Sequence, residues 1–206
     1  MSQAATHLPQ PFTKWRRVAT WVSTLGHPLL TAVLFLSYVA FRLLGAQGAA
    51  WVTGSVTLGV LVPIAFWNYR QVQRGAYTNF DVSVREQRRS FYPRLLVLLS
   101  VATALLFCFP AAAPLRAGFV IGLSLLLVCY GINFWLKVSL HAALSFFVAG
   151  CVILLDGWGW GLTALGLAVA IATSRRVLGR HSTSELLVGA ALGSLAAGAL
   201  HGWNNL

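Results

Sequence analysis

Long apolar runs separated by short polar segments dominate this sequence. A transmembrane helix needs about 20 mostly apolar residues, and seven runs approach or exceed that length: Val18–Phe41, Ala50–Trp67, Leu95–Ala113, Leu115–Leu136, Leu140–Leu155, Trp158–Thr173 and Glu185–His201. The fifth and sixth runs are short, and the Asp156-Gly157 turn between them also suits a re-entrant hairpin. The pattern predicts an all-α, polytopic transmembrane helix bundle of six or seven spans.

Composition supports a membrane protein. Of the 206 residues, 58% are hydrophobic and only 9% are charged, with mean hydropathy +0.75, whereas a soluble domain has about 25% charged residues. We expect one integral membrane domain (1–206) with a polar N-terminal segment (1–17) and no cleavable signal peptide. Six tryptophans near span ends are expected to form interfacial belts: Trp51, Trp67, Trp135, Trp158, Trp160 and Trp203. The three cysteines all lie in apolar runs and are expected to be packing residues rather than disulfides.

Lysine and arginine are concentrated on one side of the predicted bundle. The net charge is +11, from 15 Lys and Arg against 4 Asp and Glu. In so apolar a chain we attribute the excess to anionic membrane lipids and a phosphate site, and expect no nucleic acid partner. Thirteen of the 15 lie on the N-terminal side, and only Arg42 and Arg116 lie on the other. The positive-inside rule places that side in the cytoplasm, in what we expect to be a bacterial inner membrane.

Three polar segments fall on this same side, because an even number of spans separates each from the next. They are Asn68–Arg94, Lys137–Ser139 and Ser174–Ser184. Such a shared side is required if the three segments are to form one site. Side chains that act together are therefore expected in these three segments.

The last polar segment leads into the seventh span. His181 and Glu185 are four residues apart, so both lie on one face of a helix. A carboxylate there can hold one imidazole N–H and leave the other ring nitrogen free to attack. The alternative is a His–Glu pair that only supports helix packing. A hydroxyl at the helix start would cap it, and its N-terminus would favour phosphate nearby: Ser182, Thr183 or Ser184.

Basic and hydroxyl side chains accompany this pair. Arg175 precedes His181 by six residues, and a guanidinium binds phosphate oxygens through paired hydrogen bonds. Ser139 and His141 open the fifth span, where a hydroxyl suits phosphate and an imidazole can protonate a leaving alkoxide. Each also has an ordinary explanation, as positive charge at a span end or as an interfacial packing histidine.

The Asn68–Arg94 loop is dense in arginine. Arg85, Arg88 and Arg89 are spaced i, i+3, i+4, so a helical turn would cluster them, and Asp81 would pair with Arg85 at i, i+4. This density exceeds what topology requires, although a solvated surface that binds headgroups would also produce it.

Together these residues resemble the type 2 phosphatidic acid phosphatase superfamily of membrane lipid phosphatases. That family combines Lys-(six)-Arg-Pro, Pro-Ser-Gly-His and Ser-Arg-(five)-His-(three)-Asp. The third motif is matched here with Glu in place of Asp: Ser174, Arg175, His181 and Glu185.

The other two motifs are incomplete. The second keeps Ser139 and His141 but lacks the Pro and Gly. The first reads Arg85-(six)-Tyr92-Pro93, with Tyr where the family has Arg, so that Arg88 or Arg89 would supply the missing guanidinium.

The resemblance implies a role for each residue. His181 would form a phosphohistidine that water hydrolyses, Glu185 would orient it, and His141 would protonate the leaving lipid alkoxide. No metal and no cofactor are implied, and the substrate would be a lipid or polyprenyl phosphate monoester. The remaining candidates would bind the phosphate: Arg85, Arg88, Arg89, Lys137, Ser139, Ser174 and Arg175.

Two other function classes stay open. A non-catalytic lipid-binding or transport protein on a degenerate phosphatase fold is one, and a lipid phosphotransferase using the same residues is the other. A zinc site from His141, His181 and Glu185 is disfavoured because the nearby arginines would repel a cation. A magnesium-dependent prenyltransferase is excluded by the scarcity of carboxylates.

Three further features bear on packing. Gly189 and Gly193 form a small-xxx-small pair, which predicts that the last span packs closely against a neighbour and brings His181 towards the second segment. Gly118 and Gly122 repeat the spacing. His27, before Pro28, would either line a cavity or be a packed, hydrogen-bonded side chain beside a helix irregularity.

Overall fold

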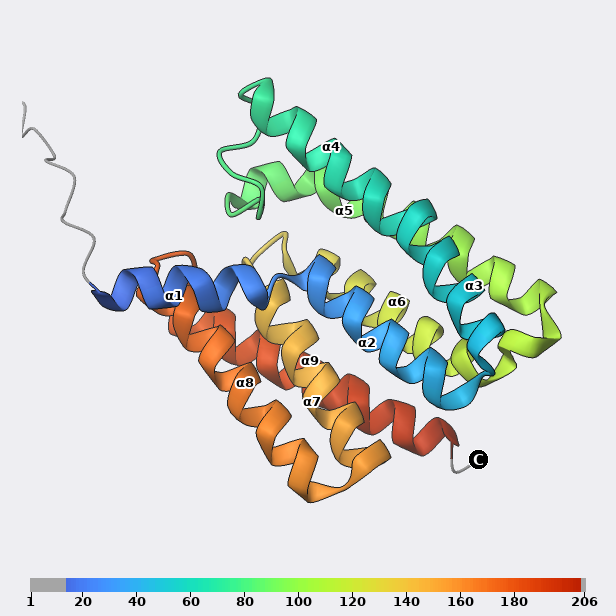
Figure 1. Ribbon diagram of the computed structural model, residues 1–206. Coiled ribbons are helices and arrows are strands. Elements are labelled where there is room, and N and C mark those ends of the chain that lie inside the picture. The colour runs from blue at the N-terminus through green and yellow to red at the C-terminus, as the bar shows by residue number, and fades with distance from the viewer. Residues whose placement is uncertain (1–13, 205–206) are drawn as a thin grey trace, which may run out of the picture.

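The computed structural model describes residues 14–204 as a bundle of helices (Figure 1). No strand occurs between residues 14 and 204. Most of the predicted polar segment 1–17 lies outside the described residues; its last four residues begin the first helix. The elements are α1 Lys14–Leu25, α2 Pro28–Leu43, α3 Ala46–Val56, the π-helix η1 Thr57–Leu61, α4 Val62–Gln73, α5 Arg85–Cys108, the 3-10 helix η2 Pro110–Leu115, α6 Arg116–Ile132, α7 Leu140–Asp156, α8 Trp158–Val177 and α9 Thr183–Asn204.

The helical runs coincide with the predicted apolar runs, but the span count is lower. In the described part of the chain, four stretches are long and apolar enough to cross a membrane: Ala46–Gln73, Arg85–Cys108, Pro110–Ile132 and Thr183–Trp203. A fifth is added if the bent pair α1 and α2 is one span. The prediction of six or seven spans is therefore not confirmed. Helix α7 has only 17 residues, and α8 loses hydropathy through its Trp-Gly-Trp-Gly start and Arg-rich end.

The first predicted span is broken at Gly26–Pro28. Helices α1 and α2 meet there at 47°. Pro28 occupies the first helical position of α2, where a backbone N–H would have no partner within the helix. His27 caps the helix, because its Nδ1 accepts a hydrogen bond from Leu29 N. Gly26 lies against α8, since a Cβ there would come within 2.5 Å of Ile171. The break turns His27 towards the interior.

Helix α9 packs directly on α7, as the glycine pair predicted. A Cβ on Gly189 would lie 2.7 Å from the Ser139 carbonyl oxygen, and one on Gly193 only 2.1 Å from that of Ala143. No larger residue fits this approach of two backbones. Gly118 and Gly122 behave differently, because a Cβ at either position would meet nothing within 4 Å.

A hydrophobic core underlies the polar loops. Tyr77 and Val82 from the loop before α5 pack with Tyr92, Cys129 and Val138, which fixes that loop against α5 and α6. All three cysteines are free, and Cys108 is exposed rather than packed. Five of the predicted belt tryptophans are exposed, whereas Trp67 is partly buried beneath the guanidinium of Arg94, 4.0 Å from its ring.

Candidate functional site

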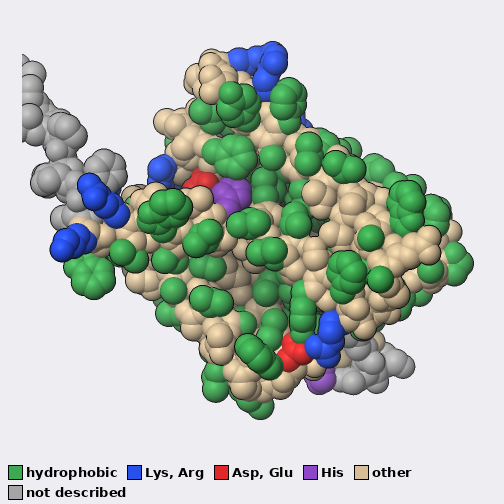
Figure 2. Space-filling model, in the orientation of Figure 1, with side chains coloured by type: hydrophobic (Ala, Val, Ile, Leu, Met, Phe, Trp, Pro, Cys, Tyr) green, Lys and Arg blue, Asp and Glu red, His purple; other side chains and the backbone are tan. Residues whose placement is uncertain are grey.

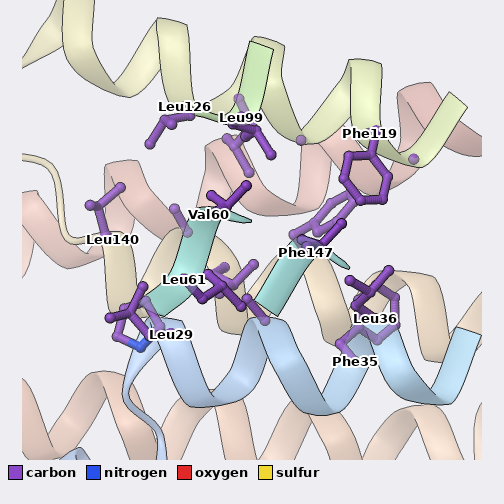
Figure 3. A pocket seen from close by; sticks show the side chains of 18 of the residues that line it. Leu29, Phe35, Leu36, Val60, Leu61, Leu99, Phe119, Leu126, Leu140 and Phe147 are labelled. Carbon is purple, nitrogen blue, oxygen red and sulfur yellow. The ribbon is translucent and has the colours of Figure 1, made fainter. Parts of the chain in front are cut away.

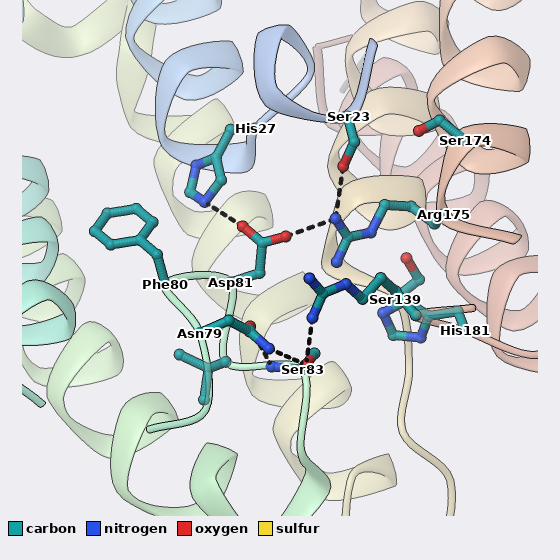
Figure 4. Close-up of polar contacts among 12 residues, drawn as sticks. Ser23, His27, Asn79, Phe80, Asp81, Ser83, Ser139, Ser174, Arg175 and His181 are labelled. Carbon is teal, nitrogen blue, oxygen red and sulfur yellow. Dashed lines mark hydrogen bonds and ion pairs between the residues drawn. The ribbon is translucent and has the colours of Figure 1, made fainter. Parts of the chain in front are cut away.

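The three polar segments meet at one end of the bundle. Arg180 Nη1 donates to Ser83 Oγ at 3.2 Å, which joins the third segment to the first. Lys137 Nζ donates to the Arg180 carbonyl at 2.9 Å, which joins the second to the third. Arg88 donates to the carbonyl of Val138, which joins the first to the second. Figure 4 shows part of this polar network.

Two local motifs fix the chain around His181. Helix α8 ends in Gly179 at φ 67°, with Arg180 N bonded to the Arg175 carbonyl at 3.0 Å and Gly179 N to that of Arg176. This is a Schellman-type C-cap, in which a glycine in the left-handed conformation lets the following amides bind the last carbonyls of the helix. Helix α9 then starts with a capping box, in which Ser182 Oγ accepts from Glu185 N at 3.3 Å and Glu185 Oε2 accepts from Ser182 N at 3.1 Å. His181 is thereby held between two well-defined helix ends.

The His181 imidazole has one nitrogen bound to a carboxylate and the other facing a guanidinium. Nδ1 lies 2.8 Å from Glu185 Oε2, so Nδ1 carries the proton and donates it. Nε2 then bears the lone pair and lies 3.4 Å from Arg88 Nη2. Burial together with the charges of Arg88, Lys137 and Arg175 lowers the pKa of His181 to about 2. The ring is neutral at physiological pH, with Nε2 available as a nucleophile.

Of the three clustered arginines, only Arg88 reaches this imidazole. Its side chain is buried and is oriented by a 2.9 Å bond from Nε to the Val82 carbonyl. Arg85 donates to the Trp135 carbonyl at 3.0 Å and pairs with Glu86. Arg89 is exposed, with its guanidinium 5.9 Å from the Phe134 ring. The structure thus separates Arg85 and Arg89 from His181.

Arg175 is buried and paired with an internal carboxylate. Its Nη1 donates to Asp81 Oδ2 and to Ser23 Oγ, each at 2.6 Å (Figure 4). Only 1% of the Arg175 side chain is exposed, and its Nε and Nη2 have no partner. Two buried donors on a cation are thus available for an anion. The predicted pairing of Asp81 with Arg85 is wrong, because α5 begins only at Arg85 and Asp81 lies in the preceding turn.

Asp81 is also bound by His27. Since His27 Nδ1 accepts from Leu29 N, its Nε2 carries the proton and donates to Asp81 Oδ1 at 3.2 Å. Burial opposes ionisation of Asp81, but the His27 hydrogen bond and the Arg175 charge outweigh it and hold the Asp81 pKa well below its usual value. Both explanations offered for His27 apply, because it is hydrogen-bonded at a helix break and also lines a cavity.

His141 lies next to this group with an unpaired ring nitrogen. It is 4% exposed, its Nε2 has no hydrogen-bond partner, and its ring meets His27 edge-on at 5.5 Å between centroids. Its contact with His27, which binds Asp81, places His141 beside the Asp81–Arg175 pair. Unpaired buried nitrogens usually mark a missing ligand or water.

The remaining predicted residues have structural partners. Lys137 Nζ lies 3.7 Å from Glu185 Oε2. Ser139 is fully buried; its Oγ caps α7 by accepting from Ala142 N at 3.4 Å, and its N–H donates to the Glu185 carbonyl at 3.2 Å. Ser174 Oγ donates to the Ile171 carbonyl at 2.7 Å, within its own helix. Ser139 therefore ties α7 to α9, whereas the Ser174 hydroxyl is bonded within α8.

Sequence reasoning missed Asp81, His27, Ser23 and Arg180 as members of this cluster. The chain separation between Asp81 and Arg175 left no spacing to detect. Asp81 is one of only four carboxylates in the chain, and a carboxylate partly removed from water is stabilised by a cation. Scarcity of acids was the available indication that Asp81 would be paired with a specific basic side chain.

The assembled site carries excess positive charge. Arg88, Lys137, Arg175 and Arg180 face the carboxylates of Asp81 and Glu185, an excess of two. On the face drawn in Figure 2, basic side chains lie mainly towards the α1 and α4 ends, with a histidine and an acidic side chain between them. Within residues 14–204, no group of three or more His, Cys, Asp or Glu side chains is placed to hold a metal ion. The arrangement suits an anion of about two charges.

No family model, curated protein or solved structure matches this chain.

Proposed function

We propose that this protein is a membrane lipid phosphatase that hydrolyses a lipid or polyprenyl phosphate monoester, as a divergent member of the type 2 phosphatidic acid phosphatase superfamily. A phosphate monoester carries about −1.5 to −2 charge at neutral pH, which balances the excess of two positive charges at the site. We further propose that the site faces the cytoplasm and that the chain crosses a bacterial inner membrane six or seven times.

The first chemical step is transfer of the phosphoryl group to His181. The Nε2 lone pair attacks phosphorus, an N–P bond forms, and the bond between phosphorus and the lipid oxygen breaks. Arg88 and the two free donors of Arg175 stabilise the charge on the equatorial oxygens. Glu185 holds the Nδ1 proton and stabilises the cationic ring that forms. The bound phosphate dianion favours protonation of His141, and the leaving alkoxide takes a proton from Nε2 of that imidazolium, which becomes a neutral ring.

The second step is hydrolysis of the phosphohistidine. Water attacks phosphorus, the N–P bond breaks, and the electron pair returns to His181 Nε2. His141, now unprotonated at Nε2, accepts the proton from that water, so that inorganic phosphate and the starting protonation states are restored.

One observation carries this proposal: the buried His181 ring with Nδ1 on Glu185 and Nε2 against Arg88. A histidine that served only packing would not need a carboxylate on one nitrogen and a cation at the other. The bond to Glu185 fixes the tautomer that leaves Nε2 unprotonated, and the Arg88 guanidinium is close enough to Nε2 to donate to an oxygen of a phosphate bound there.

The test is phosphate release from lipid monophosphates by the purified chain in nanodiscs, without added metal. His181→Ala should lower turnover by about 10⁴-fold or more, and rapid quench of the wild type should trap an acid-labile phosphohistidine. If the wild type hydrolyses no lipid phosphate in a broad panel, and His181→Ala is indistinguishable from it, the phosphatase function is rejected.

Two adjacent arginines provide a matched control. Arg88→Ala should reduce kcat/KM by about 10²-fold through loss of a phosphate donor. Arg89→Ala removes the same charge one residue away, from an exposed position, and should change it little. Equal effects of the two would mean that the arginines contribute only general surface charge.

A specific observation favours the non-catalytic rival. Asp81 already occupies one donor of Arg175, so a phosphate must bind to the remaining donors or displace the carboxylate. A protein that binds lipid phosphate without turnover would have less need to keep Arg175 free. Tight binding of a lipid phosphate with no release of phosphate would support this function, and appearance of a phosphorylated acceptor would instead indicate a phosphotransferase.

A further inference from the structure

An elongated apolar cavity begins at the candidate site and runs along the inside of the bundle. Its volume is about 570 Å³, within the range of roughly 300–1,000 Å³ typical of small-molecule sites. Apolar side chains from α2, η1, α5, α6 and α7 line it, several of which are drawn in Figure 3: Leu29, Phe35, Val60, Leu99, Phe119 and Phe147.

One end of the cavity is polar, and the far end carries His201 among apolar side chains. His27, Asp81, Arg88 and His141 line the polar end, and two of these, Arg88 and His141, belong to the candidate phosphate site. The unpaired, buried Nε2 of His141 is an independent sign that a polar ligand group belongs there. The cavity and the phosphate site are therefore continuous.

The other end lies one helix length away. Leu155 lines the cavity 14 residues after His141 on α7, which at 1.5 Å per residue is about 21 Å. Leu43, Pro114 and Leu154 also line that end. A length of about 21 Å is more than half of the roughly 30 Å hydrocarbon core of a bilayer. Because the cavity volume of about 570 Å³ is distributed along this length, the cavity is a narrow channel.

Two irregular features keep this channel open. The π-helix η1 contributes Val60 and Leu61 to the wall, and π-helical turns occur often at functional sites. Gly118 and Gly122 face the cavity, and neither would meet another atom within 4 Å if it carried a Cβ. Space has been left where side chains would ordinarily fill a core.

From these observations we propose that the cavity holds the tail of a single-chain lipid phosphate, such as a monoacyl or short prenyl phosphate, and excludes two-chain phosphatidic acid. The inference rests on the proposed phosphatase function for the position of the headgroup. One linear chain enters the channel beside His141 and lies along α7, while the phosphate sits between Arg88, Arg175 and His181. A second cavity of about 530 Å³ adjoins the far end of the channel at Leu43 and Pro114. None of its lining residues belongs to the phosphate site, so it offers a second acyl chain no place beside the headgroup.

The position of the tail can be tested without catalysis. Hexadecyl phosphate carrying a diazirine at the end of its chain is irradiated with the full-length protein in nanodiscs, and crosslinked peptides are mapped. Crosslinks should concentrate around Pro114, Leu154 and Leu155 and should be displaced by excess unlabelled hexadecyl phosphate. Crosslinks spread over outward-facing residues such as Leu127 and Leu162, which are 57% and 56% exposed, would overturn the inference.

A cavity-filling variant tests the specificity. Gly122→Leu projects a side chain into the channel, and Gly166→Leu places the same side chain on an exposed surface of α8 as the matched control. Gly122→Leu should lower kcat/KM for dodecyl phosphate by about tenfold or more, the equivalent of roughly 1.4 kcal/mol. It should leave turnover of phenyl phosphate, which has no chain, unchanged. Gly118→Leu serves in its place if Gly122→Leu does not fold.

Comparing one-chain with two-chain lipid phosphates separates the possible outcomes. Oleoyl lysophosphatidic acid and farnesyl phosphate distinguish monoacyl from prenyl tails, and both should be hydrolysed at least about tenfold more efficiently than dioleoyl phosphatidic acid. Equal turnover of the two-chain lipid, or insensitivity of all lipids to Gly122→Leu, rejects the tail channel while keeping the phosphatase. Crosslinking confined to the channel with no hydrolysis of any phosphate rejects the phosphatase while keeping the channel.

Discussion

Each end of α7 lies near an aspartate–arginine pair, and the two pairs are held very differently. At the end that carries the candidate site, Asp81 binds Arg175, whose side chain is 1% exposed and retains two unpaired donors. At the opposite end Asp156 binds Arg42, whose side chain is 49% exposed, and Tyr38 bonds to both. The same ionic chemistry thus occurs once with a buried arginine that keeps unpaired donors, and once with a half-exposed arginine whose aspartate also accepts from Tyr38.

This difference separates a ligand site from a structural contact. An exposed pair exchanges its hydrogen bonds with water and contributes about 0–1 kcal/mol to stability. A buried guanidinium has lost its water, so each unpaired donor costs free energy until an anion arrives. The Asp81–Arg175 end therefore has reason to bind phosphate, whereas the Asp156–Arg42 end has none. Three changes would break or sharpen this contrast.

The largest contrast is expected from removing each arginine. Arg175→Met leaves the Asp81 charge buried with only His27 as a partner and should lower the unfolding free energy by about 3–5 kcal/mol. Arg42→Met should lower it by no more than about 1 kcal/mol. Denaturant titration in mixed micelles measures both. Similar losses would show that the two pairs are energetically equivalent.

A smaller contrast is expected in the pH dependence of stability. Burial and neighbouring cations lower the pKa of His181 to about 2, against about 6.5 in an unfolded chain. Below about pH 6.5 the unfolded state binds a proton that the folded state does not, so stability falls as the pH is lowered. Between pH 7 and pH 5, His181 alone should lower the free energy of unfolding by about 2 kcal/mol.

Substitution identifies the group responsible for that slope. In His181→Gln, the fall in unfolding free energy between pH 7 and pH 5 should be smaller than in the wild type by about 2 kcal/mol. In Arg42→Met, this fall should be the same as in the wild type. The Asp81 carboxyl does not contribute in this window, because its lowered pKa gives stability that is lost only at more acidic pH. An unchanged slope in His181→Gln would mean that this imidazole is not buried as described.

The smallest effect concerns the internal carboxylates. Asp81→Asn removes the negative charge that competes for Arg175 and should tighten inhibition by inorganic phosphate by about tenfold. Asp156→Asn, at the opposite end, should leave phosphate inhibition unchanged. Weaker inhibition in Asp81→Asn would instead assign Asp81 to positioning Arg175 for its ligand.

Much of the fold could be predicted because apolar periodicity in a membrane chain is strong. The seven apolar runs are largely helical, and the close packing of the last span against a neighbour followed from the spacing of Gly189 and Gly193. Run length did not reveal the break at Gly26–Pro28, because the bend depends on how α1 packs against α8. The limited hydropathy of α8 is present in its sequence, but counting run length alone does not detect it. Gly118 and Gly122 have the same spacing as the packed pair but face a cavity, so spacing alone does not identify the neighbour.

The candidate site could be predicted only where its members are close in sequence. His181 and Glu185 are joined by one helical turn, and their hydrogen bond follows directly from that spacing. Which arginine reaches His181 depended on where α5 begins and on the burial of Arg88, neither of which the i, i+3, i+4 spacing determines. The Asp81–Arg175 pair joins residues 94 positions apart, beyond any local pattern.

The capping box of α9 has a consequence for how the site comes into being. A single oxygen of Glu185 holds both the Ser182 amide at the start of the helix and the His181 ring. Fraying of the first turn would release the imidazole, and rotation of the imidazole would loosen the first turn. Slow hydrogen exchange of that amide would therefore report, in a single peak, the fraction of molecules ready to react.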